Sequence, residues 1–189
     1  ILMAALHLEH ISKQFPGVKA LDDITISIDE GEIHALCGEN GAGKSTLMNI
    51  ISGNLQPDTG TMLINGMPVS FRSAKEAFEN KIAIVYQHLS LVDSLSIAEN
   101  IYANQQPRNQ WGLIQYEKLI EQTQHLLKTL KLDALNPRTL VSRLSPAEKQ
   151  MVEIAKALSK NPSIFILDEP TASLAESETK TLFEILYAQ

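Results

Sequence analysis

The sequence lacks the features of secreted and membrane-spanning proteins. Its single cysteine, Cys37, cannot form a disulfide within one chain, and no Cys and His residues have the spacing of a zinc site. The longest unbroken apolar run, residues 1–6, is far shorter than the roughly 20 residues that cross a bilayer. The start also lacks the basic segment and long apolar core of a signal peptide. These absences favour a cytosolic protein, with Cys37 as a small buried hydrophobe.

The charge balance excludes another class of partner. The chain has 16 basic and 22 acidic residues and a net charge of −6, which argues against wide contact with nucleic acid or an anionic membrane. A local site for an anion stays compatible with this balance. With 189 residues, 44% hydrophobic and 20% charged, the chain is expected to form one compact globular unit, either complete or incomplete.

The N-terminal half combines strands with a glycine-rich loop. Isoleucines alternate with polar residues over residues 24–28, and the alternation over residues 6–11 is less strict, so both segments are predicted as half-buried strands. Residues 33–37 form a short apolar run that predicts a strand, and a helix is predicted over residues 44–52. Turn residues on both sides of the run 61–64 predict a hairpin.

The C-terminal half is mainly helical. Apolar residues recur with a helical period from Tyr116 to Leu130, a second helix is predicted after Ser145, and a last helix closes the chain. Residues 82–86 are mostly apolar and predict another strand. The four apolar residues 164–167 predict a strand that is buried on both faces, and they lead into an acidic pair.

The glycine-rich loop carries the most specific motif. Residues 38–46 read G-E-N-G-A-G-K-S-T and satisfy the phosphate-loop pattern between a strand and a helix. The glycines allow backbone N–H groups to surround phosphate oxygens, and the helix N-terminus favours an anion. Lys44 is expected to reach the β- and γ-phosphates of ATP, and the Ser45 hydroxyl to ligate Mg²⁺. The alternative is a plain connecting turn, which gives no reason for a lysine and a hydroxyl after the third glycine. The predicted nucleotide-binding residues of the loop are Gly38, Glu39, Asn40, Gly41, Ala42, Gly43, Lys44, Ser45 and Thr46.

An acidic pair follows the last predicted strand. Asp168 fits the Walker B aspartate that holds Mg²⁺ together with Ser45, and Glu169 is placed to polarise the attacking water. An acidic strand end that merely faces solvent is the alternative reading. The phosphate loop in the same chain favours the catalytic one.

Four stretches together resemble the ATPase domain of ABC transporters. They are the phosphate loop, Gln87, residues 144–156 with the sequence L-S-P-A-E-K-Q-M-V-E-I-A-K, and residues 167–174 with the sequence L-D-E-P-T-A-S-L. Their order and spacing cover nearly the whole chain. In detail the chain resembles the first ATPase domain of bacterial monosaccharide importers, whose ATP-binding subunit carries two such domains. Residues 17–21, 31–36 and 150–156 suggest that subfamily.

The resemblance implies further site residues. Phe15 would stack on adenine with Val18 beside it, whereas the alternative for Phe15 is a core aromatic at a strand end. Gln87 would contact Mg²⁺ or water and move with a transmembrane partner, and its alternative is an ordinary loop glutamine. Ser145 would contact the γ-phosphate held by a second ATPase domain.

The signature stretch departs from the family pattern L-S-G-G-Q. Pro146 and Ala147 replace both glycines, and Glu148 replaces the glutamine. Ser145, Pro146 and Glu148 read as a capping box at a helix start. Proline has no N–H, Ala147 adds a side chain and Glu148 adds negative charge, so the site is either impaired or works through Ser145 alone. A further departure is Ala175, where the family usually has aspartate.

The resemblance also implies a fold and an extent. The fold class is α/β, a P-loop NTPase (RecA-like) core with an N-terminal antiparallel β subdomain and an α-helical insert. Residues 1–95 and 161–189 would form the nucleotide-binding core, and residues 96–160 the helical subdomain. Family members carry a switch histidine beyond the Walker B glutamate, whereas all five histidines here lie upstream of Glu169. We therefore expect a C-terminally truncated domain with weak activity.

The expected function is ATP hydrolysis that drives solute import, with a sugar as the cargo. Mg²⁺ and ATP are the cofactors. The expected partners are membrane permease subunits, a second ABC ATPase domain and, indirectly, a periplasmic solute-binding protein, without nucleic acid. The location would be the cytoplasmic face of the membrane, peripherally bound. The alternatives are a soluble ABC ATPase that acts on ribosomes or chromosomes, and a nucleotide-binding assembly module with little turnover.

Overall fold

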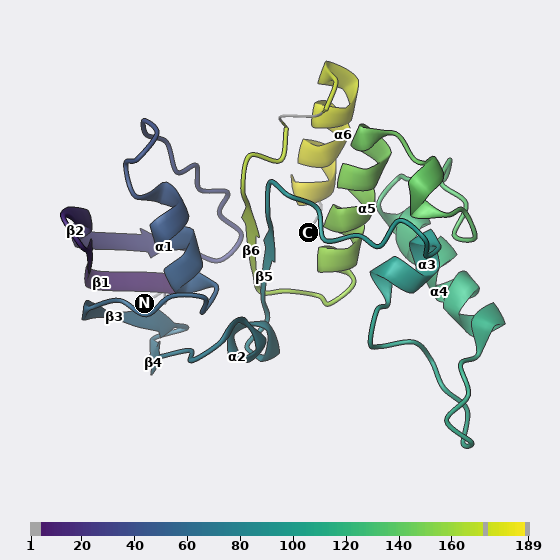
Figure 1. Cartoon of the computed structure of the whole chain (residues 1–189), viewed down its shortest axis with the longest axis horizontal. Coiled ribbons are helices and arrows are strands. Elements are labelled where there is room, and N and C mark those ends of the chain that lie inside the picture. Colours follow the sequence, from purple (N-terminus) through teal and green to yellow (C-terminus); the bar gives the residue numbers. More distant parts are fainter. Residues whose placement is uncertain (1–4, 172–173, 188–189) are drawn as a thin grey trace. The chain divides into compact units, whose positions relative to one another are not determined.

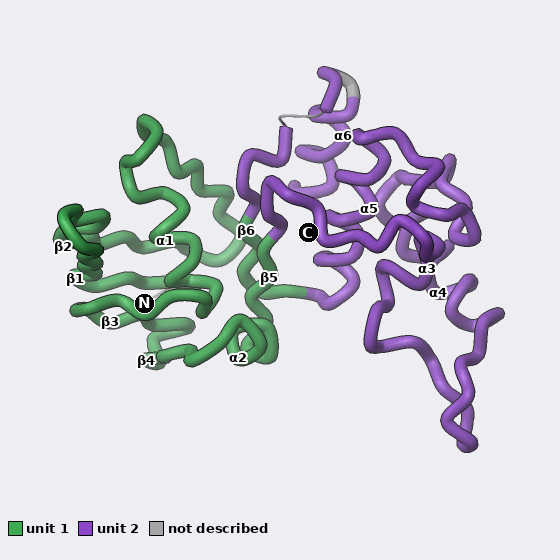
Figure 2. Tube along the Cα trace, in the orientation of Figure 1, with its two compact units in different colours: residues 1–84, 162–166 green, residues 85–161, 167–189 purple. Residues whose placement is uncertain are grey.

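The computed structural model describes residues 5–171 and 174–187. Within it the chain forms two compact units, shown in green and purple in Figure 2. Unit 1 comprises residues 1–84 and 162–166, and unit 2 comprises residues 85–161 and 167–189. The subdomain boundaries predicted from the sequence, after residues 95 and 160, stay a prediction.

Unit 1 is built on an antiparallel sheet with a helix beside it (Figure 1). The strand order is β2-β1-β3-β4. The elements are β1 (Leu6–Phe15), β2 (Val18–Ile28), α1 (Lys44–Ile51), β3 (Thr59–Ile64), β4 (Met67–Val69) and α2 (Ala74–Glu79). Short turns join β1 to β2 and β3 to β4, and the predicted hairpin over residues 61–64 is confirmed.

The core of unit 1 forms between the sheet and α1. Leu8 and Ile11 of β1 are fully buried together with Leu47 and Ile50 of α1. The spacing of three between Leu8 and Ile11 would place them on opposite faces of a regular strand. The register of β1 shifts between these residues, where His10 has a φ of 54°. A bulge of this kind restores Ile11 to the buried face, which explains the imperfect alternation in the sequence.

Strands β5 (Ile82–Val85) and β6 (Ile164–Leu167) form a separate two-stranded sheet. The Lys81 carbonyl accepts from the Ser163 N–H, and the Val85 carbonyl accepts from the Asp168 N–H. The partners advance in the same direction along both strands, so the pair is parallel. The acidic pair therefore follows the carboxyl end of β6.

Unit 2 is mainly helical. Its elements are α3 (Ile97–Ile101), α4 (Tyr116–Thr129), the 3₁₀ turn η1 (Val141–Arg143), α5 (Pro146–Leu158) and α6 (Glu176–Tyr187). The apolar stripe of α4 is buried as its period predicts, with Leu119 and Leu127 at 0% and 1% exposure. Ile97, Ile154 and Leu182 bring α3, α5 and α6 into the buried set. The predicted helices after Ser145 and at the end of the chain are confirmed.

Three predictions about strands and burial are wrong. Residues 33–37 form no strand, and Ile33 and Leu36 are 48% and 40% exposed. An apolar run supplies strand propensity, but a strand also needs a ladder partner, and the sheet of unit 1 offers none to this segment. Cys37 lies in the same segment and is exposed rather than buried. Strand β6 is half-buried along its length instead of buried on both faces, because β5 is its one ladder partner in the described sheets.

Candidate functional site

The N-terminus of α1 is open toward the phosphate loop. The N-cap of α1 is Gly43, with φ 87° and no side-chain cap. The Leu47 N–H donates to the Gly43 carbonyl at 2.9 Å, so the helical ladder begins directly after the loop. The first N–H groups of a helix have no partner within the helix. Without a capping side chain, those of α1 can donate to an anion.

Gly43 combines a left-handed backbone conformation with a lack of space for a side chain. Its φ lies in the left-handed region, where a side chain adds strain. A Cβ at this position would lie 2.3 Å from the Ala20 carbonyl oxygen and 2.9 Å from a methyl carbon of Leu21. The loop therefore packs directly on strand β2, and the sheet fixes the start of α1.

Lys44 folds back over the loop. Its ammonium nitrogen lies 2.7 Å from the Gly38 carbonyl oxygen and 2.9 Å from that of Glu39, and it donates to both. Ser45 is exposed and stands one residue further along the first turn of α1. A lysine cation, a hydroxyl and uncapped N–H groups thus gather at one helix end, as the motif predicts.

Phe15 and Val18 lie opposite each other where β1 turns into β2. They are register partners, and they are 39% and 59% exposed. The alternative of a core aromatic is therefore wrong for Phe15. The Lys13 ammonium lies 5.9 Å from the centre of the Phe15 ring and 2.6 Å from an Asp58 carboxylate oxygen. The pKa of Asp58 is held below its usual value, mainly by the hydrogen bond from Lys13 and to a lesser extent by the one from the Gln14 N–H.

In unit 2 the structure brings Gln87 and Glu169 together. The side-chain amide of Gln87 donates to the Glu169 carboxylate at 3.2 Å across 82 positions of sequence. Glu169 is exposed and has a φ of 48°, a region that non-glycine residues rarely occupy. Strained backbone of this kind is concentrated at functional sites. The preceding Asp168 is half-buried and is fixed through its N–H to Val85.

The altered signature forms a closed capping box at the start of α5. The Ser145 hydroxyl accepts from the Glu148 N–H at 3.2 Å, and the Glu148 carboxylate accepts from the Ser145 N–H at 2.8 Å. Pro146 has no N–H to offer. The serine hydroxyl acts only as an acceptor in this box, so its hydrogen stays able to donate. One side-chain donor therefore remains where two backbone donors are unavailable.

The predicted residues divide between the units. The phosphate loop, Phe15 and Val18 belong to unit 1, whereas Gln87, Ser145, Asp168 and Glu169 belong to unit 2. Among residues 5–171 and 174–187, no three His, Cys, Asp or Glu side chains form a group that could hold a metal ion. The donor set nevertheless fits Mg²⁺, which binds through one or two carboxylates, a hydroxyl and phosphate oxygens rather than a protein cage. Ala172 and Ser173 of the motif lie outside the described residues.

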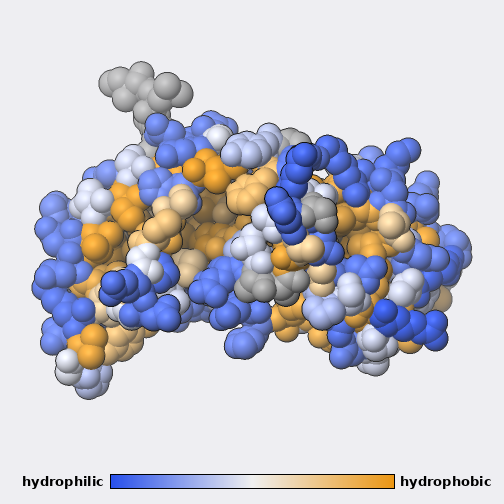
Figure 3. All heavy atoms as spheres, turned by 90° about the horizontal axis from the view of Figure 1, so that it is seen from above, coloured by the Kyte–Doolittle hydropathy of each residue, from blue (hydrophilic) through white to orange (hydrophobic). Residues whose placement is uncertain are grey.

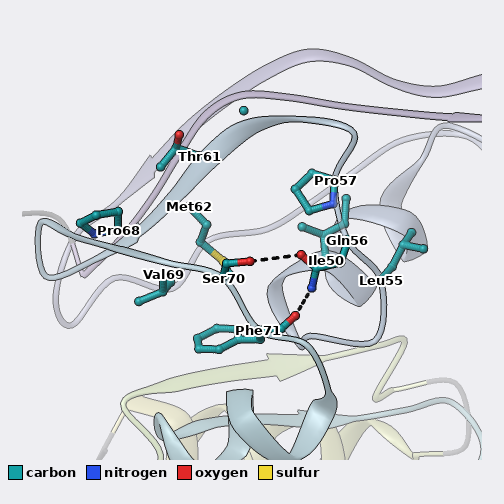
Figure 4. A pocket seen from close by; sticks show the side chains of 11 residues that line it. Ile50, Leu55, Gln56, Pro57, Thr61, Met62, Pro68, Val69, Ser70 and Phe71 are labelled. Atoms are coloured by element: carbon teal, nitrogen blue, oxygen red, sulfur yellow. Dashed lines mark hydrogen bonds between the residues drawn. The ribbon is translucent and has the colours of Figure 1, made fainter.

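A separate cavity lies at the opposite end of α1 (Figure 4). It has a volume of about 310 Å³ and is lined mainly by residues of α1, β3, β4 and the adjoining loops. The Gln56 amide donates to the Phe71 carbonyl and accepts from the Ser70 hydroxyl, so its polar groups are satisfied internally. None of residues 38–46 is among the residues that line this cavity, so it is distinct from the phosphate loop.

Other apolar side chains lie on the surface. Figure 3 shows orange, hydrophobic areas among the blue, hydrophilic ones on one face. Trp111 is the most exposed of the large hydrophobic residues that the structure describes, at 78%. It stands on a turn in which the Asn109 side chain accepts from the N–H groups of Trp111 and Leu113. Within the described part of the chain, no helix is both long and apolar enough for a membrane span.

Sequence reasoning missed a group of polar contacts behind Gln87. The Ser90 hydroxyl donates to the Glu153 carboxylate at 2.6 Å, and Lys156 donates to the same hydroxyl oxygen at 2.6 Å. These contacts join positions 63 and 66 residues apart. Glu153, a charged residue on a helix that is otherwise apolar around it, was the only signal in the sequence.

Comparison with known proteins gives a consistent family. The family described as ABC transporter matches residues 21–172. A protein of Burkholderia ambifaria named for ribose, galactose and methyl galactoside import is 51% identical over 96% of this chain, and the xylose import ATP-binding protein XylG of Moorella thermoacetica is 49% identical over 96%. The chain spans 35% and 36% of the length of these relatives.

Solved structures agree with the family. The ADP conformation of MJ1267, an ATP-binding cassette of an ABC transporter, matches with a TM-score of 0.83 and 29% identity, covering 98% of this chain and 76% of that one. The dimeric, post-hydrolysis cassette MJ0796 with ADP and phosphate matches with a TM-score of 0.78 and 26% identity, covering 96% and 81%. The predicted α/β fold with an antiparallel β subdomain is confirmed.

Proposed function

The chain belongs to the ABC transporter family, and from this premise we propose that it is the ATP-binding and ATP-hydrolysing part of a sugar importer. The support for sugar as the cargo comes from relatives at 49–51% identity that are named for sugar import. This chain spans about a third of the length of these relatives.

In this proposal each unit contributes a share of the chemistry. The uncapped turn of α1 and Lys44 bind the phosphates of ATP, and Phe15 with Val18 contacts the adenine. Ser45, Asp168 and Gln87 would hold Mg²⁺, which when bound neutralises developing phosphate charge. Glu169 orients and polarises the attacking water, and its bond to Gln87 fixes the carboxylate. Ser145 donates its hydroxyl hydrogen to the γ-phosphate held by a second ATPase domain.

The observation that carries the proposal is the glycine-capped end of α1 under Lys44. Calorimetry of the chain with Mg-ATP tests it. Lys44→Ala should weaken binding at least about tenfold, because a charge-assisted bond to phosphate is lost. Lys75→Ala, an exposed lysine of the same unit that pairs with Glu79, is the matched control and should bind as the parent does. Equal affinity of the parent and Lys44→Ala would refute the assignment of the loop.

The proposed partner is a membrane permease that docks near Gln87. A single cysteine at Ser94 tests this in a Cys37→Ser background, since Cys37 is exposed and would react as well. Cross-linking in cells should capture a permease subunit. Capture of ribosomal protein or DNA without a permease would instead support a soluble ABC ATPase.

The second candidate is an assembly module that binds ATP but hydrolyses little of it. The closed capping box and Pro146 favour this candidate, because they remove donors from the signature end of α5. Phosphate release at saturating ATP, measured for the full-length protein, separates the two. A turnover time of the order of seconds supports the ATPase. Normal ATP binding without phosphate release supports the assembly module.

A further inference from the structure

The turn between α3 and α4 carries two strongly exposed apolar side chains. Figure 1 shows this teal segment extending away from the helices of unit 2. Trp111 and Leu113 are 78% and 66% exposed, and Gly112 between them has a φ of 77°. A β-bridge between Arg108 and Ile114 joins the two arms of the turn. We call residues 107–115 the hairpin tip.

The backbone of the hairpin tip is hydrogen-bonded within the tip itself. The Asn109 side-chain oxygen accepts from the N–H groups of Trp111 and Leu113 at 2.9 Å and 3.0 Å. The Asn109 backbone donates to the Leu113 carbonyl and accepts from the Gly112 N–H, both at 2.9 Å. The apolar side chains therefore stand on a turn in which these four N–H groups already have partners.

An internally bonded turn of this kind suits a lipid surface. Backbone N–H and C=O groups find no partners among acyl chains, so each unpaired group costs free energy on insertion. Protein partners, by contrast, supply donors and acceptors of their own. Tryptophan combines a large apolar ring with one N–H donor and is enriched at the boundary between lipid and water. The hairpin tip thus combines a suitable side chain with a suitable backbone.

The hairpin tip is also free of negative charge. The chain has 22 acidic residues, yet residues 100–116 contain none and have Arg108 as their one charged residue. The flanking acidic side chains are engaged, since Glu99 is bonded within the cap of α3 and Glu117 pairs with Arg138 at 2.9 Å. The Arg108 guanidinium donates to a carbonyl of the tip at 3.2 Å and has further N–H groups that can bind a lipid phosphate.

The size of the hairpin tip favours lipid over a protein partner. A stable protein interface takes about 20–30 residues from each side. The nine residues of the tip do not supply such an area. A few apolar side chains are enough, however, to add to the membrane attachment of a protein that has a second anchor.

We propose that the hairpin tip inserts Trp111 and Leu113 into the headgroup region of a phospholipid bilayer. The proposal goes beyond the proposed function, because the contact needs neither ATP nor a permease. The Trp111 ring lies at the boundary of headgroups and acyl chains, and Arg108 binds a lipid phosphate. The contact is a surface anchor of marginal strength, which adds to a stronger attachment.

The test uses the fluorescence of Trp111, the one tryptophan of the 189-residue sequence. Neutral phosphatidylcholine vesicles are the probe, because the net charge of −6 disfavours an anionic surface. At lipid concentrations of the order of 1 mM, the emission should shift to shorter wavelengths. Quenching by acrylamide in the water should fall at least about twofold, and lipids brominated on their acyl chains should quench the emission.

Matched variants show whether the tip makes the contact. Leu113→Asp should weaken the affinity for vesicles at least about tenfold, because a charge replaces an apolar group that enters the lipid. The milder Leu113→Ser should weaken it about threefold. Met67→Asp in unit 1 is the matched control, since Met67 is 68% exposed, lies beside a hairpin turn and gains the same charge. It should bind vesicles as the parent does.

An emission that does not respond to vesicles would overturn the proposal. Equal affinities of Leu113→Asp and Met67→Asp would overturn it too, because the contact would then lie outside the tip. A shift that appears on raising the protein concentration without lipid would show that the tip contacts a second copy of the chain, and would replace the proposal by a protein interface. None of these outcomes bears on the proposed function, which the binding of Mg-ATP tests separately.

Discussion

The N-termini of α1 and α5 are both predicted to face phosphate, yet they are built in opposite ways. Helix α1 begins at Gly43, has no side-chain cap and has no acidic residue in its first turn. Helix α5 begins with Ser145, has proline at its first position and engages the Ser145 and Glu148 N–H groups in a reciprocal capping box. The first is open to an anion, and the second is satisfied by its own residues.

The difference shows that a helix N-terminus can bind phosphate only through backbone N–H groups that its own side chains leave uncapped. A capping box stabilises a helix by about 1 kcal/mol and in the same step withdraws donors from any ligand. At α5 the stabilising choice and the binding choice conflict, because the capping box engages the Ser145 and Glu148 N–H groups and Pro146 has none. At α1 the conflict does not arise, because the sheet holds Gly43 in place.

The largest effect is expected from closing the open end. Gly43→Ala should lower the free energy of unfolding by about 3 kcal/mol and abolish ATP binding, because the new Cβ meets the Ala20 carbonyl and the residue has a positive φ. Urea unfolding and calorimetry measure the two effects. Gly41→Ala is the matched control, since Gly41 also has a positive φ but has nothing within 4 Å of a Cβ. It should lose only about 1 kcal/mol. Equal losses in both variants would show that packing on β2 is irrelevant.

The next largest effect is expected from restoring glycines at the start of α5. Pro146→Gly combined with Ala147→Gly restores one backbone N–H and removes a side chain near the predicted γ-phosphate contact. ATP hydrolysis by the full-length protein should rise about tenfold, since one preorganised donor can contribute this much or more. Phosphate release at saturating ATP measures it. If the double variant hydrolyses ATP no faster than the parent, the altered signature does not limit turnover and Ser145 alone suffices.

A smaller effect is expected on stability from the cap itself. Ser145→Ala should lower the free energy of unfolding of the chain by about 1 kcal/mol, because the Glu148 N–H loses its acceptor. Ser96→Ala removes the equivalent cap of α3 and should cost about the same. Only Ser145→Ala should also reduce ATP hydrolysis in the full-length protein. Equal effects of both variants on hydrolysis would refute a phosphate contact at Ser145.

Local sequence patterns predicted helices α1, α4, α5 and α6, but the helices α2 and α3 and the long-range contacts were missed. Helix α5 and its cap follow from Ser145, Pro146 and Glu148, which lie within four positions. The same S-x-x-E pattern stands at Ser73 and Ser96, where α2 and α3 begin, and would have located both starts. These signals are local because a cap joins residues of a single turn.

Features that depend on distant partners could not be predicted in this way. The apolar run 33–37 has strand propensity, but its state is decided by which strands lie beside it, and the prediction was wrong. The contacts of Ser90 with Glu153 and Lys156 join residues more than 60 positions apart, and nothing near Ser90 indicates Glu153 as its partner. The phosphate-loop motif could be recognised because its residues lie within nine positions, and its role in binding phosphate stays a prediction. The roles of Gln87, Asp168 and Glu169 stay predictions.

The smallest effect is the expected pH dependence of stability at the capping box of α3, which has the same form as the box of α5. Bonds from the Ser96 hydroxyl, then from the Ser96 N–H, hold the pKa of Glu99 below its usual value of 4.5. A carboxyl whose pKa is lowered by folding stabilises the fold above its unfolded pKa, and this contribution disappears as the pH falls through the folded pKa. The parent should therefore exceed Glu99→Gln in unfolding free energy by less than about 1 kcal/mol at pH 7, and the difference should shrink below pH 4.5. In a Ser96→Ala background the pH dependence of the difference should become smaller, because the largest cause of the shift is gone while the N–H of residue 96 can still donate to Glu99. Urea unfolding of the four proteins between pH 3 and pH 7 tests this, and an undiminished pH dependence in Ser96→Ala would show that the Ser96 hydroxyl is not the main cause of the lowered pKa of Glu99.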